Sequence, residues 1–150
     1  LGRDVLAGLT TRTSADAVAQ LSALLSSLGY RVRGVRVSGC LHLKSAATRA
    51  GPRTVVVNPE WLDVSELDGW DIVRVDPAEP QAANVLWLGA VTLVPAAFPR
   101  TAERLARATG LPAVAIPAAE LALAEGSLTC GSLVVEISDA QQATMAGRRG

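Results

Sequence analysis

The side chains best suited to covalent chemistry are the only histidine and one of the two cysteines. His42 lies in the segment GCLHLKS at 39–45, and Cys130 lies in EGSLTCGS at 125–132. Both segments are predicted to be loop-to-strand junctions, from which side chains reach a cleft on a rigid base. A thiol beside an imidazole is a nucleophile beside a proton-transfer partner. The pair therefore predicts nucleophilic catalysis; a small core cysteine and a structural histidine are the alternatives.

The composition indicates one globular domain. Of 150 residues, 49% are hydrophobic and 19% are charged, and 14 basic residues balance 14 acidic ones. Without a basic stripe and interleaved aromatic residues, nucleic acid is not an expected partner. No apolar run approaches the ~18 residues of a membrane span, so no membrane association is expected. Two cysteines without framework spacing favour a reducing compartment, which predicts a cytoplasmic location.

A pattern of strand, helix, glycine and strand occurs three times. The closing glycines are Gly29, Gly69 and Gly110, which are 40 (29 to 69) and 41 (69 to 110) residues apart. Such a unit cannot bury its own apolar face and needs neighbours of the same kind. The spacing therefore predicts stacked modules, with accidental α/β alternation as the alternative.

Local signals place the elements of each module. Helices are expected after the N-cap Ser14, at Asn58-Pro59 and at Pro99, which suit the first turn of a helix. Hairpins are expected to turn at 50–52, between strands 44–48 and 53–57, and at 89–90, between strands 84–88 and 91–94. Each module is then a ββαβ unit of mixed strand direction. Around a pseudo-symmetry axis, the loops of His42, Asn84 and Cys130 would face one centre, which predicts a His42–Cys130 separation within about 8 Å.

Five motifs together resemble one enzyme family. They are GLTTRT at 8–13, LHLKS at 41–45, AAN at 82–84, PAAFPR at 95–100 and EGSLTC at 125–130. From about residue 3 to residue 135, their order is similar to the C-terminal portion of the dimethylarginine dimethylaminohydrolases, in the amidinotransferase-like (pentein) superfamily. The resemblance implies an α/β fold, a pentein-type αβ-propeller of ββαβ modules, with about three of five modules here. The expected domain is 1–137, and 138–150 is expected to be a disordered tail.

The resemblance also implies a reaction. The family hydrolyses Nω-methylated arginine to citrulline and a methylamine through a covalent thiouronium intermediate, without a metal or organic cofactor. Cys130 would be the nucleophile, His42 the general acid/base, and Arg12 the anchor for the α-carboxylate of this small guanidino substrate. The family's catalytic carboxylate lies upstream of the stretch that begins at Leu1. We therefore expect a portion of a longer enzyme that is inactive by itself; the sequence leaves a homodimer open.

Two classes of alternative remain. One is a sister enzyme: an arginine deiminase, another amidine hydrolase or an amidinotransferase. The other is a non-catalytic binding protein on the same propeller, which loss of the three site residues would have favoured. Cys40 is expected to be a bystander thiol, because two potential ligands fall short of a zinc site. Asn84 and Arg100 are expected to be structural. The acidic residues of the second module are expected to form a solvated helix face and its exit: Glu60, Asp63, Glu66, Asp68 and Asp71.

Overall fold

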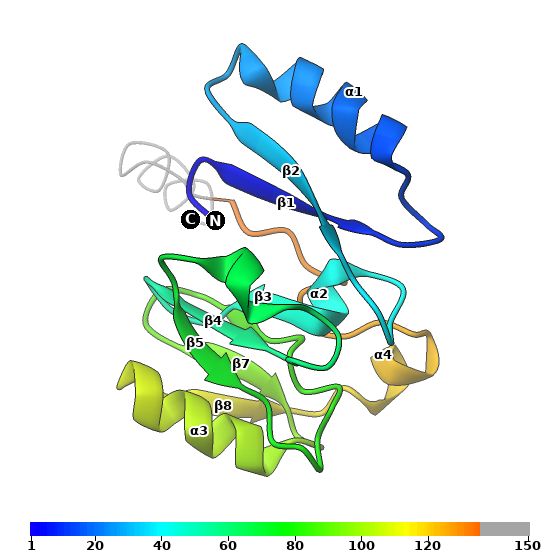
Figure 1. Cartoon of the computed structure of the whole chain (residues 1–150). Helices are drawn as coiled ribbons and strands as arrows, with labels where there is room; N and C mark the ends of the chain where they lie inside the picture. The colour runs from blue at the N-terminus through cyan, green and yellow to red at the C-terminus, as the bar shows by residue number, and fades with distance from the viewer. Residues whose placement is uncertain (136–150) are drawn as a thin grey trace, which may run out of the picture.

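The protein is represented by a computed structural model that describes residues 1–135. The tail expected at 138–150 lies outside the described residues, as do the last two residues of the expected domain. The described part of the chain alternates strands and helices (Figure 1). In chain order the elements are β1 (Asp4–Leu9), α1 (Ala15–Ser26), β2 (Arg31–Arg36), α2 (Leu43–Ala46), β3 (Ala47–Arg49), β4 (Thr54–Val57), the 3₁₀ helix η1 (Val64–Leu67), β5 (Asp71–Arg74), β6 (Leu86–Trp87), β7 (Thr92–Pro95), α3 (Pro99–Thr109), β8 (Ala113–Ile116) and α4 (Ala119–Leu123).

The first unit comprises β1, α1 and β2. The two strands are parallel, pairing Asp4 with Arg31 at one end and Leu9 with Arg36 at the other. The helix connecting them packs on β2 and forms the upper edge of the molecule in Figure 1. Ser14 is its N-cap, as predicted: the serine side chain accepts a hydrogen bond from the Ala17 N–H at 3.2 Å, which satisfies a free donor of the first turn.

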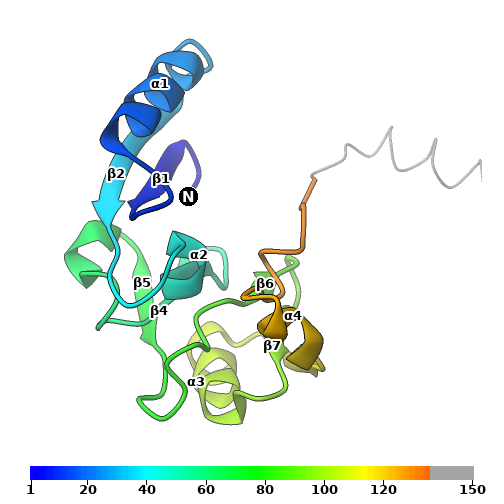
Figure 2. The same ribbon diagram turned by 90° about the vertical axis from the view of Figure 1, so that its right-hand side faces the viewer.

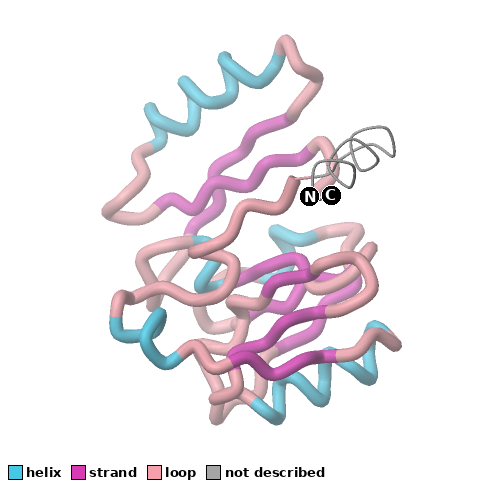
Figure 3. The backbone as a smooth tube through the Cα atoms, turned by 180° about the vertical axis from the view of Figure 1, so that it is seen from behind, coloured by secondary structure: helices cyan, strands magenta, loops and turns pink. Residues whose placement is uncertain are grey.

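The second and third units each contain a three-stranded sheet, and the strand directions are the same in both. In the second, β3 is antiparallel to β4, and β4 is parallel to β5. In the third, β6 is antiparallel to β7, and β7 is parallel to β8, with α3 as the connection. The third unit is thus a predicted ββαβ unit of mixed strand direction, and the second has the same strand directions with only the 3₁₀ helix η1 between β4 and β5. Both lie in the lower half of Figure 3. Within residues 1–135, β1 has no such antiparallel neighbour. The number of units in a complete propeller stays a prediction.

Two local predictions were wrong. Lys44 was expected at the start of a strand, but it lies in the single helical turn α2, and β3 begins at Ala47. The second module was expected to contain a helix opening at Asn58-Pro59; the chain instead turns there, and only the short η1 is helical. The Asn58 side chain accepts from the Glu60 N–H at 2.9 Å and its carbonyl accepts from the Leu62 N–H at 3.1 Å, so one turn is capped here but does not continue as a helix.

The central strand β4 separates two hydrophobic cores. All four of its residues are buried, and successive side chains of a strand point to opposite faces. Val56 therefore faces the core shared with the third unit, while Val55 and Val57 face the core shared with the first. Val35 of β2 is fully buried in this second core. The units are thus joined by continuous apolar packing, which fixes the loops between them.

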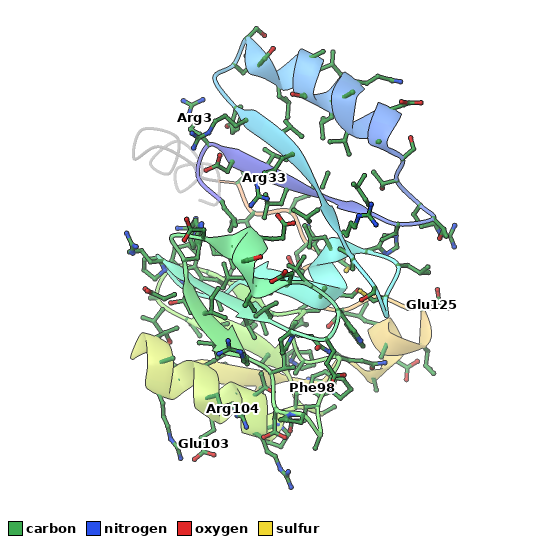
Figure 4. The ribbon with its side chains drawn as sticks, in the orientation of Figure 1. Arg3, Arg33, Phe98, Glu103, Arg104 and Glu125 are labelled. Carbon is green, nitrogen blue, oxygen red and sulfur yellow. The ribbon has the colours of Figure 1, made fainter. Side chains whose placement is uncertain are left out.

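Polar contacts join the units at their edges. Arg33 of β2 pairs with Glu66 of η1, and Figure 4 shows Arg33 on the strand of the first unit. Between the second and third units, the Arg49 guanidinium lies 4.4 Å from the ring centroid of Trp87 and 5.6 Å from that of Trp70. Such stacking is worth about 0.5–2 kcal/mol depending on exposure. These contacts fix the relative orientation of the three units.

Candidate active site

His42 lies in the connection between β2 and α2. It occupies the N-cap position of α2 with extended backbone angles, φ −134° and ψ 141°, and its side chain is exposed. Its carbonyl accepts from the Ser45 N–H at 2.9 Å and from the Cys40 thiol at 3.4 Å. The predicted loop-to-strand junction is therefore corrected: a helical turn stands between His42 and β3. The hydrogen bonds to its carbonyl fix the backbone of His42, and the residue is exposed to solvent.

Arg12 lies in the turn between β1 and α1, and its side chain is exposed. The turn is tied to the histidine segment by Thr10. The Thr10 hydroxyl donates to the Leu41 carbonyl at 2.9 Å and accepts from the Arg12 N–H at 3.1 Å. Gly8 permits this proximity, since a Cβ there would lie 3.0 Å from the Leu43 Cβ and 3.2 Å from the Leu43 backbone nitrogen. A side chain at position 8 would push the two segments apart.

Cys130 lies in the turn that follows α4, and it is exposed. This segment runs past β6, as Figure 2 shows. Between α4 and the turn, Glu125 has φ 55°, a left-handed conformation that is uncommon for a residue other than glycine. Figure 4 places Glu125 at the outer side of this loop. No strand follows Cys130 up to residue 135, so the loop-to-strand prediction is also wrong for this segment.

Asn84, which precedes β6, holds the Cys130 turn. Its amide nitrogen donates to the Cys130 sulfur at 2.9 Å, and its amide oxygen accepts from the Thr129 N–H at 3.1 Å. Its backbone carbonyl accepts from the Ser127 hydroxyl at 3.3 Å. The expected structural role is therefore confirmed, since Asn84 binds loop backbone. The bond to sulfur was not expected.

One contact joins the histidine and cysteine segments. The Lys44 ammonium donates to the Thr129 carbonyl at 3.4 Å, and these two residues are immediate neighbours of the site, two positions after His42 and one before Cys130. Both also line a cavity of about 430 Å³. Thr10 and Lys44 thus bring the segments of Arg12, His42 and Cys130 into one region. The predicted separation between the His42 ring and the Cys130 sulfur stays a prediction.

The second cavity is larger and lies elsewhere. This groove of about 890 Å³ is lined by Thr10, Arg36, Trp61 and their neighbours between the ends of β1 and β2 and the segment before η1. None of the three predicted site residues lines this groove, and none lines the smaller cavity. The smaller cavity is lined by Thr129, next to Cys130, whereas no residue of the Cys130 turn lines the groove, so we do not associate the groove with the chemistry of Cys130.

The two cysteines have different surroundings. Both are free thiols, but Cys40 is half-buried and packs against the core between the first and second units. Burial raises the pKa of the Cys40 thiol, because the charged thiolate is disfavoured away from water. A raised pKa lowers the fraction of Cys40 that is thiolate at neutral pH, which is consistent with a bystander thiol.

The sequence did not predict that Thr10 and Lys44 join the segments of this region. It also did not predict that Asn84 contacts the sulfur of Cys130. Arg100, expected to be structural, has its guanidinium 3.7 Å from the Asp76 carboxylate. The acidic residues of the second unit do not form a helix face, and Glu66 is paired with Arg33.

Within residues 1–135, no three His, Cys, Asp or Glu side chains group as metal ligands do, and no helix is long and apolar enough to cross a membrane.

Comparisons with known proteins agree with the motifs. No family model matches the sequence. A dimethylarginine dimethylaminohydrolase from Streptomyces coelicolor is 38% identical over 133 residues, which is 89% of this chain and 50% of that protein. The enzyme of the same name from Pseudomonas aeruginosa is 29% identical over 126 residues, 84% of this chain and 49% of that protein.

The fold is similar as well. The solved structure of a cysteine-to-serine mutant of the Pseudomonas aeruginosa protein, in complex with citrulline, superposes with a TM-score of 0.79 at 26% identity. The match covers 87% of this chain and 51% of that one. The chain spans about half the length of the curated relatives it matches. By sequence and by fold, the chain is therefore similar to about half of a dimethylarginine dimethylaminohydrolase.

Proposed function

We propose that the protein to which this chain belongs is a cysteine-dependent hydrolase of guanidino compounds. The observation that carries the proposal is the Lys44–Thr129 hydrogen bond, which joins the segment of His42 to that of Cys130. Relatives named as dimethylarginine dimethylaminohydrolases support the same chemistry. Nω-methylated arginine is the proposed substrate, and citrulline and a methylamine are the proposed products.

In the proposed mechanism, Cys130 attacks as a thiolate. A guanidinium carbon is a weak electrophile, and a soft sulfur nucleophile held beside it can add to it. The C–N bond to the methylamine then breaks, and His42 supplies the proton that this leaving group takes. The remaining thiouronium is attacked by water, from which His42 removes a proton. The C–S bond breaks, citrulline leaves, and the thiolate is restored.

Arg12 is the proposed anchor for the substrate. A guanidinium group binds a carboxylate through two parallel hydrogen bonds, which fix orientation as well as charge. The Arg12 side chain is exposed, and its backbone N–H is fixed by Thr10. Bound through its α-carboxylate at this turn, an arginine derivative would extend its guanidino end toward Cys130.

The test is catalytic activity in the full coding sequence that contains this chain. Cys130→Ser and His42→Ala are each expected to lower citrulline production by at least about 10³-fold, whereas Cys40→Ser should retain it. A covalent adduct on the Cys130 peptide, seen by mass spectrometry after rapid quenching with substrate, is the expected intermediate. Near-normal turnover in Cys130→Ser would remove this residue from the mechanism.

The same protein distinguishes sister activities. Dimethylarginine, monomethylarginine, arginine and agmatine would be offered as single substrates, with and without an amine acceptor. Release of methylamine supports the proposal; faster release of ammonia from arginine favours a deiminase, and transfer to the acceptor favours an amidinotransferase. Because both cysteines are free thiols, we also propose a reducing, cytoplasmic location.

A further inference from the structure

We propose that Asn84 is the positioning residue of the Cys130 nucleophile. It lies just before β6 in the third unit, and from there its side chain holds the Cys130 sulfur and favours the thiolate form. The catalytic meaning of this inference rests on the proposed function. The contact between Asn84 and the Cys130 sulfur can be tested without the proposed function, because thiol reactivity can be measured without turnover.

Three hydrogen bonds connect Asn84 to the cysteine turn. The amide nitrogen donates to the Cys130 sulfur at 2.9 Å, the amide oxygen accepts from the Thr129 N–H, and the backbone carbonyl accepts from the Ser127 hydroxyl. Asn84 is 3% exposed, and all three bonds are part-buried although Cys130 itself is exposed. One buried side chain therefore binds both the reactive atom and the backbone beside it.

The Thr129 bond fixes which end of the amide faces sulfur. A backbone N–H can only donate, so the group that meets it must be the amide oxygen. The NH₂ group then faces Cys130, and it too can only donate. A donor favours the charged, accepting form of its partner, which here is the thiolate. The geometry thus favours the form of the cysteine that acts as a nucleophile.

Asn84 itself is fixed by the core. Its neighbours Ala83 and Val85 are 0% and 1% exposed. The Thr48 hydroxyl of β3 donates to the Ala83 carbonyl at 2.6 Å and accepts from the Val85 N–H at 3.2 Å. The position of the sulfur is therefore set by the junction of the second and third units, although Cys130 is in an exposed turn.

The experiment measures alkylation of Cys130 by iodoacetamide over a pH series, in a Cys40→Ser background of this chain that leaves one thiol. Asn84→Asp keeps an oxygen for the Thr129 N–H but places a carboxylate at the sulfur. We expect about tenfold slower alkylation at neutral pH and a rate profile moved to higher pH. Ser127→Ala is the matched control, since it removes a loop bond and leaves the NH₂ donor; its profile should match the background.

Circular dichroism would show that each variant is folded. Equal profiles for Asn84→Asp and the background would overturn the proposal, as would an equal shift in Ser127→Ala. Should Asn84→Asp fail to fold, the side-chain NH₂ resonances of Asn84 in the Cys40→Ser background serve instead. They are expected to shift with pH as Cys130 ionises and to lose that step in Cys130→Ser; resonances that do not respond would contradict the contact.

This outcome is separable from the proposed function. Slower alkylation of Asn84→Asp together with full activity of Cys130→Ser would retain Asn84 as a partner of sulfur and refute the hydrolase mechanism. An unchanged alkylation profile with an inactive Cys130→Ser would retain the mechanism and refute the role of Asn84.

Discussion

The Thr10 hydroxyl donates a hydrogen bond to the Leu41 carbonyl, 31 residues further along the chain. The same hydroxyl accepts from the Arg12 N–H. One oxygen atom therefore connects the turn that carries the proposed carboxylate anchor to the segment that carries the proposed acid/base. Its loss should affect both stability and substrate binding.

Thr10→Val keeps the shape of the side chain and removes both hydrogen bonds. The free energy of unfolding is expected to fall by about 0.5–1.5 kcal/mol, because two hydrogen bonds at an exposed site are exchanged for bonds to water. Urea denaturation of this chain would measure it, with the exposed neighbour Thr11→Val as control. In the full coding sequence, KM should rise more than kcat falls. Equal stability of the two variants would show that the Thr10 bonds contribute nothing.

Gly8→Ala tests the close approach of β1 to the start of α2. The added Cβ would lie 3.0 Å from the Leu43 Cβ and 3.2 Å from the Leu43 backbone nitrogen, so the backbone itself must move. Overpacking of this kind costs about 1–3 kcal/mol. Gly131→Ala is the control, since its Cβ would have nothing nearer than 3.9 Å. A Gly8→Ala chain as stable as the Gly131→Ala chain would show that the segments accommodate the methyl group freely.

Glu79 caps α3 from outside the helix. Its two carboxylate oxygens accept from the Arg100 and Thr101 N–H groups at 3.0 and 2.7 Å, and the residue is 7% exposed. The helix has no side-chain cap of its own at Phe98.

Glu79→Ala should therefore lower the free energy of unfolding by about 1–3 kcal/mol, because a buried donor at Thr101 and a part-buried donor at Arg100 lose their acceptor. Glu103→Ala, which removes only an exposed pair with Arg107, should cost less than about 0.5 kcal/mol. Thermal denaturation followed by circular dichroism would compare the two variants. Similar losses in both would contradict a capping role for Glu79.

Because the Cys40 thiol is half-buried, we expect the free energy of unfolding to fall in alkaline solution. Burial raises the pKa of its thiol in the folded state, so the folded chain keeps the proton at a pH where the unfolded chain releases it. The associated stability is present below the unfolded value of about 8.5 and is lost as the pH rises through the folded value. Between about pH 7 and pH 10, Cys40→Ala should lose less stability than the wild type. Parallel losses in urea titrations at the two pH values would disprove the linkage.

Local chemistry predicted the elements whose ends are set by single residues. Ser14 caps α1, and Gly110 ends α3 with φ 68°, as a C-terminal glycine does. The helix expected at Asn58-Pro59 is divided into two short turns, each with its own cap. Asn58 accepts from the Glu60 N–H, and Asp63 accepts from the Ser65 N–H at the start of η1. A helix-opening signature predicts where a helix begins but not how far it continues.

The site shows a similar division. His42, Cys130 and Arg12 are proposed from residue type and motif, which local sequence contains. The bonds that hold their segments join residues far apart: Asn84 to Cys130 across 46 positions and Lys44 to Thr129 across 85. Such pairs depend on how the units dock, and no local pattern encodes them. The hairpin signal that predicted a strand over 44–48 likewise did not reveal the helical turn α2.

The Arg49 stack has a spectroscopic consequence. Trp70 and Trp87 flank this arginine where the second and third units meet, and Trp61 lies against Gly39, where the first unit meets the second. These are all the tryptophans of the sequence. The intrinsic fluorescence of the protein therefore reports on the junctions between units, so a change in emission would register their separation before any unit loses its own strands.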